Sequence, residues 1–216
     1  MQYNSLLFCL QYLQFYQMKN KILFFFFCVF SIGLISFSIQ SNPELIEFVV
    51  PKKWPKPAYN FAKNPVSEEG FQLGRKLFYD PILSRDSTIS CASCHLQYTG
   101  FTHVDHAVSH GIEGRKGTRN SPVLINLAWN SNFHWDGGVN NLEVQGINPI
   151  KHPAEMDNTL EEVIRRLSLS ETYPALFKKA FGSTEINTAT IMKALTQYTV
   201  SLVSSNSKYD QVQRKE

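Results

Sequence analysis

A stretch of five residues, Cys91-Ala92-Ser93-Cys94-His95, constrains this chain more than any other part of its sequence. The pattern C-x-x-C-H is the attachment signature of a c-type haem. Two thiols on one turn of backbone can form thioethers with the two vinyl groups of the porphyrin, and the adjacent histidine can bind the iron as its proximal ligand. The sequence therefore predicts Cys91 and Cys94 as haem-binding residues and His95 as an iron ligand.

Other uses of a cysteine pair fit the chain less well. A structural zinc site needs four ligands, and the only other cysteines, Cys9 and Cys28, lie in a hydrophobic N-terminal stretch. A thioredoxin-like redox pair would need a βαβ setting, of which the sequence gives no sign. The net charge is only +3, and the lysines and arginines are scattered. Because nucleic-acid binders carry clustered basic faces, we expect no nucleic-acid partner.

The N-terminal stretch has the pattern of an export signal. Lys19 and Lys21 precede an apolar run over residues 22–39, which matches the charged and hydrophobic regions of a secretory signal. A methionine directly before these lysines suggests that residues 1–17 are read-through upstream of the true start. We expect residues 18–41 to be a cleaved signal peptide or, as the alternative, an uncleaved membrane anchor. Either one predicts a periplasmic protein.

The remaining chain predicts an all-α, cytochrome c-like haem domain with long irregular loops over residues 67–209. Residues 42–66 are rich in proline and predict an extended lead-in. No convincing strand alternation occurs, and irregular loops are expected over residues 99–118 and 132–153, the latter with one helical turn near Leu142. The predicted helices run from a Ser67 cap to Asp80-Pro81, over 123–129, from Leu160 to about Leu167, over 174–181 before Gly182, and from a Thr188 cap over 189–202.

Five motifs around the haem signature closely resemble those of the bacterial di-haem cytochrome c peroxidases, whose relatives mature a tryptophan-derived quinone. The resemblance covers residues 54–209 and predicts a domain that reduces hydrogen peroxide to water with electrons from a small redox protein, a cytochrome c or a cupredoxin. The motifs are Leu73-Gly74 with Leu77-Phe78-Tyr79-Asp80-Pro81, Arg119-Asn120-Ser121-Pro122, Phe133-His134-Trp135-Asp136-Gly137-Gly138, Gln145, and Pro153-Ala154-Glu155-Met156.

The resemblance also implies roles for individual residues. His95 matches the proximal ligand of the peroxidatic haem. Glu155 matches a distal glutamate that handles protons during O–O cleavage, and Gln145 matches a distal glutamine that holds the peroxide. Trp135 matches a tryptophan between the two haems, and Asn120 matches a ligand of a calcium ion. Haem c, one in this chain, and calcium are therefore the expected cofactors.

The chain departs from the family pattern in two places. The peroxidases carry S-x-G-H, whose histidine ligates the resting haem, but the ungapped position here is Ile112, and His110 lies two residues early. We therefore expect an open sixth site, with His110 as the distal iron ligand only if the loop slips. The second departure is that only one C-x-x-C-H is present, so we expect a truncated product that lacks the second haem domain.

The sequence leaves two alternatives to this function. Met156 follows His95 by 61 residues, a plausible separation for an electron-carrier cytochrome with His/Met ligation. The other alternative is a non-functional remnant that does not incorporate haem.

Overall fold

The structure is a computed structural model that describes residues 43–216. Across these residues the chain is helical, and strand-like pairing is limited to four isolated bridges, so the all-α class is confirmed. The helices are α2 (Glu68–Tyr79), α3 (Cys91–Cys94), α4 (Leu142–Gln145), α5 (Ile147–Lys151), α6 (Leu160–Leu169), α7 (Tyr173–Phe181), α8 (Thr188–Val200) and α9 (Lys208–Arg214). The predicted read-through, signal peptide or anchor over residues 1–41 lies outside the described residues. No helix within residues 43–216 is long and apolar enough to cross a membrane.

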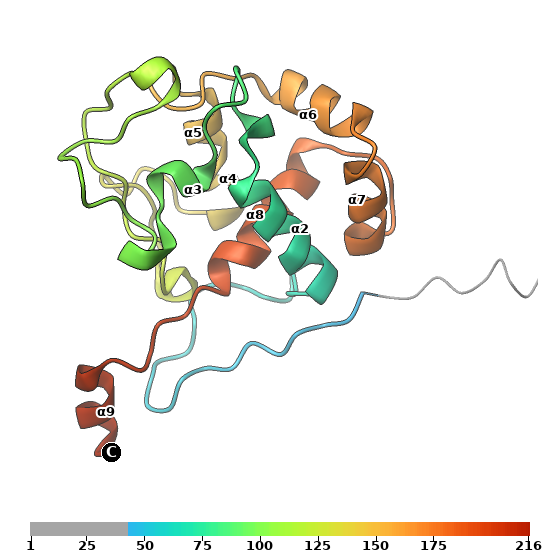
Figure 1. Cartoon of the computed structure of the whole chain (residues 1–216). Helices are drawn as coiled ribbons and strands as arrows, with labels where there is room; N and C mark the ends of the chain where they lie inside the picture. The colour runs from blue at the N-terminus through green and yellow to red at the C-terminus, as the bar shows by residue number, and fades with distance from the viewer. Residues whose placement is uncertain (1–42) are drawn as a thin grey trace, which may run out of the picture. The chain divides into compact units, whose positions relative to one another are not determined.

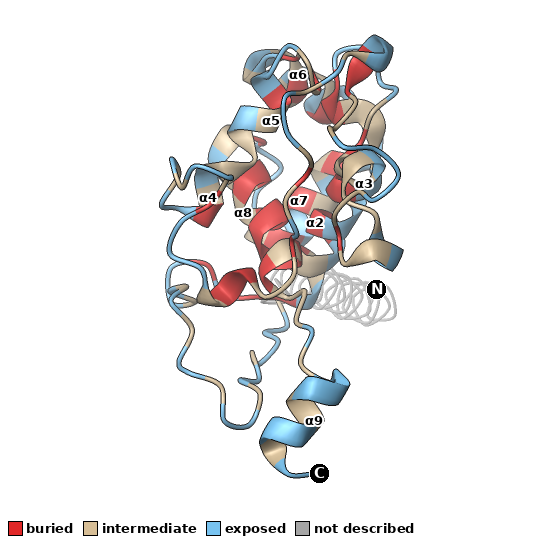
Figure 2. Ribbon diagram, turned by 90° about the vertical axis from the view of Figure 1, so that its left-hand side faces the viewer, coloured by how far each residue is buried: buried red, intermediate tan, exposed pale blue. Residues whose placement is uncertain are grey.

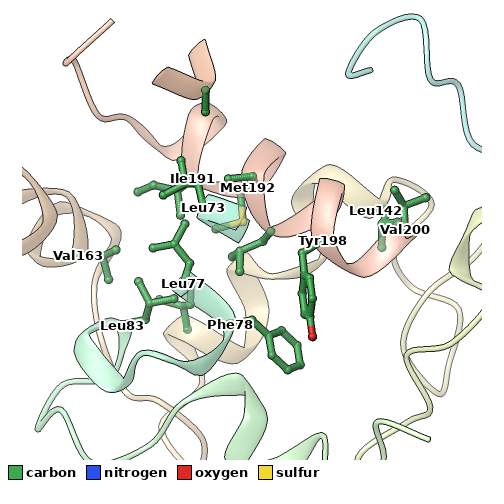
Figure 3. Packing of buried hydrophobic residues seen from close by; sticks show 14 of the residues in the cluster. Leu73, Leu77, Phe78, Leu83, Leu142, Val163, Ile191, Met192, Tyr198 and Val200 are labelled. Atoms are coloured by element: carbon green, nitrogen blue, oxygen red, sulfur yellow. The ribbon is translucent and has the colours of Figure 1, made fainter. Parts of the chain in front are cut away.

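Helices α2 and α8 cross at the centre of the domain, with α6 and α7 on one side and α3, α4 and α5 on the other (Figure 1). Helix α2 begins where predicted, because the Ser67 hydroxyl accepts a 3.1 Å hydrogen bond from the amide of Gly70. Gly74 allows close approach of the two helices, since a Cβ at this position would collide with the carbonyl of Ala194. Figure 3 shows the apolar side chains that fill this crossing, among them Leu73, Leu77, Phe78, Ile191, Met192 and Tyr198.

The predicted helices near the C-terminus are present, with one correction. Helix α6 starts at Leu160 as predicted, and α7 ends before Gly182, whose φ of 77° is left-handed. The helix predicted over 189–202 is α8, which starts one residue earlier and ends at Val200. Its cap is Asn187 and not Thr188, because the Asn187 side chain accepts a 3.0 Å hydrogen bond from the amide of Thr190.

The helix predicted over residues 123–129 is wrong. Only Leu127–Trp129 forms a short 3-10 helix. The reason is a tertiary contact at Asn126, whose amide donates to the Leu202 carbonyl at 2.7 Å and whose side chain exchanges two hydrogen bonds with the backbone of Ser204. Asn126 adopts a left-handed φ of 62°, which a right-handed helix cannot contain, so the predicted helix does not form.

The segment predicted to be irregular over 132–153 holds more helix than expected. Helices α4 and α5 follow each other with Gly146 between them. Pro149 lies in the first turn of α5, where a missing N–H costs no intrahelical hydrogen bond. Gly146 lies against α8, because a Cβ there would come within 3.2 Å of the Met192 sulfur. The two short helices are therefore fixed at one side of the core.

Residues 43–66 contain no helix and are attached to the domain through aromatic side chains. The rings of Trp54 and Trp129 meet edge to face with centroids 4.6 Å apart, and the Trp129 indole donates to the Pro55 carbonyl at 2.8 Å. Figure 2 shows buried residues concentrated in α2 and α8, whereas α9 lies apart from them and is mostly exposed.

Candidate haem site

The cysteine motif lies on the single turn of α3. Ser90 caps this turn, and the Ser93 side chain accepts a hydrogen bond from the Ser90 amide in return. Cys91 and Cys94 are free thiols, and burial raises the pKa of Cys91 to about 12. The turn therefore presents two protonated thiols one helical turn apart, with His95 directly behind them.

His95 is oriented by a hydrogen bond at the ring nitrogen that would not bind the iron. Its Nδ1 lies 2.9 Å from the carbonyl oxygen of Phe101, and a left-handed φ of 60° at Phe101 helps to turn this carbonyl back toward the ring. The bond leaves Nε2 as the nitrogen available to a metal, the arrangement usual for a histidine ligand. Burial lowers the pKa of His95, and this favours the neutral imidazole that binds iron.

Two adjoining cavities open beside the motif, and both are lined by Cys94, His95, Gln145, Pro149 and Glu155. The larger has a volume of about 720 Å³, within the range of about 300–1,000 Å³ that small-molecule and cofactor sites occupy. The smaller, of about 70 Å³, is mainly apolar and includes Phe78 and Leu142 in its wall. Paired thiols, an oriented imidazole and this mixed lining fit a covalently attached haem.

Glu155 and Gln145 reach this site from two different segments. Gln145 is the last residue of α4, and Glu155 lies in the turn that follows α5. Burial raises the pKa of Glu155, and His152 and His134 oppose that shift. A carboxyl group whose pKa is raised holds a proton more readily and can both accept and donate one during a reaction.

Trp135 and Asn120 line the larger cavity next to each other. The indole of Trp135 donates to the Asn120 carbonyl at 2.6 Å, and 61% of the tryptophan is exposed. The Asn120 side chain donates to the His103 carbonyl at 2.7 Å. Within residues 43–216 no group of three or more His, Cys, Asp or Glu side chains is arranged to hold a metal ion, so calcium at Asn120 stays a prediction.

His110 lies outside both cavity linings. Its ring stacks on His106 with centroids 4.5 Å apart, and His106 stacks in turn on His103. Ile112 is fully buried, and its amide donates to the Glu155 carbonyl at 2.8 Å. The segment over residues 109–112 thus contacts the turn that carries Glu155 through Ile112.

Sequence reasoning missed several features of the site. Met192 lines the smaller cavity together with Met156, whereas the sequence pattern placed position 192 only within the helix predicted over 189–202. The histidine stack could have been suspected from three histidines within eight residues. The ion pairs that Arg85 and Arg115 make next to Glu155 had no sequence signal, because both are ordinary charged residues in loops.

The helical fold and the thiol–imidazole site define a c-type cytochrome domain. The sequence model of the di-haem cytochrome c peroxidase family matches residues 68–216. The chain therefore belongs to the di-haem cytochrome c peroxidase family, and haem c is the cofactor that this membership supports.

Relatives of known name agree with the family assignment. Over 149 residues the chain is 38% identical to methylamine utilization protein MauG of Methylorubrum extorquens, covering 68% of this chain and 42% of the relative. Over 150 residues it is 35% identical to cytochrome c551 peroxidase of Nitrosomonas europaea, covering 69% and 44%. A solved MauG-like protein associated with microbial copper homeostasis superposes with a TM-score of 0.71 at 35% identity, covering 79% of this chain and 50% of that one. The chain spans less than half the length of MauG and of the cytochrome c551 peroxidase.

Proposed function

We propose that residues 67–209 form the peroxidatic haem domain of a bacterial di-haem peroxidase, with one haem c attached to Cys91 and Cys94. Its substrate is hydrogen peroxide, and His95 is the proximal iron ligand. The observation that carries this proposal is the shared cavity lining of His95, Gln145 and Glu155. An iron ligand, a hydrogen-bond donor and a proton-transfer group therefore face one space.

The chain's own residues have distinct tasks in this proposal. The haem, when bound, supplies the redox chemistry. The Glu155 carboxylate would take a proton from one oxygen of the peroxide and return it to the other oxygen, which leaves as water. The Gln145 amide donates a hydrogen bond to the peroxide without competing for its proton. The Phe101 carbonyl keeps the His95 ring in one orientation and raises the basicity of its other nitrogen.

The electrons come from a small redox protein, a cytochrome c or a cupredoxin, in the periplasm. Trp135 supports an electron path toward this haem, because it lines the larger cavity while 61% of its surface is exposed. A second haem, which the description of the di-haem family implies, would be the entry point for these electrons. Asn120 is the proposed contribution of this domain to a calcium site.

The role of Glu155 is tested with Glu155→Gln in the haem-loaded full chain. We expect intact haem binding and a reaction of the reduced haem with peroxide that is slower by about 10²–10⁴-fold, the usual loss on removing a general acid–base group. Glu161→Gln is the matched control, because Glu161 is an exposed glutamate in α6 outside both cavities. If Glu155→Gln reacts as fast as this control, another group transfers the proton.

A second function, electron transfer with His95 and Met156 as axial ligands, rests on the buried position of Met156 in the smaller cavity. Met156→Leu separates the two functions. In the peroxidase the variant keeps the spectrum of the parent, because Met156 serves as a packing residue. In an electron carrier the substitution removes an iron ligand and lowers the reduction potential.

A further inference from the structure

We propose that Arg115, together with Arg85, is a positioning residue that holds the Glu155 turn in place beside the cavity. This inference rests on the proposed proton-transfer role of Glu155. Neither arginine lines either cavity. In this proposal the two arginines act on the chemistry through the backbone that carries Glu155.

The backbone of the turn is held from outside at three carbonyl groups. The Arg115 guanidinium donates to the Pro153 carbonyl at 2.8 Å. The Ile112 amide donates to the carbonyl of Glu155 itself at 2.8 Å, and the Arg85 amide donates to the Met156 carbonyl at 2.9 Å. Pro153, Glu155 and Met156 are thus held by two segments that are distant in the sequence.

The two arginines are joined into one network by two carboxylates. Asp157 accepts from Arg85 at 2.8 Å and from Arg115 at 2.9 Å. Glu113 pairs with the same two arginines at 2.7 and 2.6 Å. A single exposed ion pair contributes little, but a connected network of planar guanidinium groups adds geometric restraint.

Two backbone features show how closely the turn is restrained. Asp157 adopts a left-handed φ of 46°, a conformation that persists in a non-glycine residue only where its surroundings enforce it. Gly111 lies directly against the turn, because a Cβ there would collide with the carbonyls of Ala154 and Glu155. The loop that bears Arg115 is thus in van der Waals contact with the backbone of Glu155.

An arginine is needed at position 115 because one guanidinium serves three acceptors. It binds the Pro153 carbonyl and the carboxylates of Glu113 and Asp157 together. A lysine keeps the charge but lacks the planar fork. We therefore expect Arg115→Lys to retain part of the function and Arg115→Met to lose it.

The first test measures the reaction of the haem-loaded full chain with peroxide. A misplacement of about 1 Å can cost up to about 10²-fold in rate, so we expect Arg115→Met to react about 10–100-fold more slowly, with Arg115→Lys between it and the parent. Arg165→Met is the matched control, because Arg165 pairs with Glu162 at 2.7 Å on α6 and lines neither cavity. It should react like the parent.

The double variant Arg115→Met/Glu155→Gln shows whether Arg115 acts through Glu155. We expect it to be no slower than Glu155→Gln alone, since a positioning residue has nothing left to position. Additive losses would overturn the inference. A normal rate for Glu155→Gln combined with a slow Arg115→Met would instead show that the proposed role of Glu155 is wrong and that Arg115 does not act through it.

The second test is amide hydrogen exchange of the haem-loaded full chain, which needs no turnover. Peptides over 108–116 and 152–158 should exchange about tenfold faster in Arg115→Met than in Arg165→Met, because the Ile112 amide loses its fixed acceptor. Unchanged exchange in both peptides would overturn the inference. The same measurement on haem-loaded Arg115→Lys decides the question if Arg115→Met fails to load haem, because exchange in Arg115→Lys should lie between that of Arg115→Met and that of Arg165→Met.

Discussion

The hydroxyl of Tyr173 in α7 is expected to stabilise the connection between α2 and the segment that leads to the haem motif. Tyr173 is 2% exposed, and its hydroxyl donates to one carboxylate oxygen of Asp80 at 2.7 Å. The other carboxylate oxygen of Asp80 accepts from the Ile82 amide at 2.9 Å. Asp80 thus connects the end of α2, the following 3-10 helix (Pro81–Leu83) and α7.

Tyr173→Phe removes this bond and leaves the ring in place. A hydrogen bond to a charged group contributes about 1.5–3 kcal/mol. For a domain of this size each kcal/mol shifts the melting temperature by about 2–4 °C, so we expect Tm to fall by about 3–12 °C. The assay is thermal unfolding of the full chain followed by circular dichroism at neutral pH.

Tyr209→Phe is the control for this substitution. Tyr209 lies on α9 and is 71% exposed, so the same chemical change should leave Tm where it is in the parent. If Tyr173→Phe and Tyr209→Phe melt together, the Tyr173–Asp80 bond contributes nothing to stability and the reasoning is refuted.

Two further predictions concern the loop histidines and α6. In His110→Ala the iron of the oxidised, haem-loaded chain should be high-spin, as in the parent, because the His110 ring stacks on His106 and lies outside both cavity linings. If the parent is instead low-spin and His110→Ala is high-spin, His110 is the distal ligand. Arg165 and Arg166 lower the pKa of Glu162 to about 2, so the ion pairs stabilise the fold above the unfolded pKa near 4.3 and are lost as the pH falls through about 2. The Tm difference between the parent and Glu162→Gln should therefore shrink as the pH is lowered from neutrality toward 2, and a constant difference would contradict this.

Local signals in the sequence predicted the helices that have periodic apolar faces and strong ends. Helix α6 and helix α7, with Gly182 after it, follow directly from such signals. The error over 123–129 has the opposite cause. Ser121-Pro122 is a good helix start, but Asn126 binds the chain beyond α8, and no local pattern reveals a partner almost eighty residues away.

In the candidate site, too, residues with a local sequence signal were predicted and those that depend on tertiary contacts were not. The C-x-x-C-H signature predicts the thiols and His95 because their geometry is contained in five residues. The resemblance to a family supplied Gln145 and Glu155, which no spacing rule would have selected. The Phe101 carbonyl behind His95 and the arginine network behind Glu155 are tertiary contacts of common residue types. Such contacts become visible only when the loops are seen folded.

We infer that His95 and Glu155 face a covalently bound haem whose sixth position is open. The most direct measurement is the absorption spectrum of the oxidised, haem-loaded full chain, recorded on material that keeps its haem on a denaturing gel. We expect a high-spin spectrum that changes on adding a small iron ligand such as cyanide. A low-spin spectrum with a methionine–iron charge-transfer band would contradict it and identify Met156 as the sixth ligand of an electron carrier.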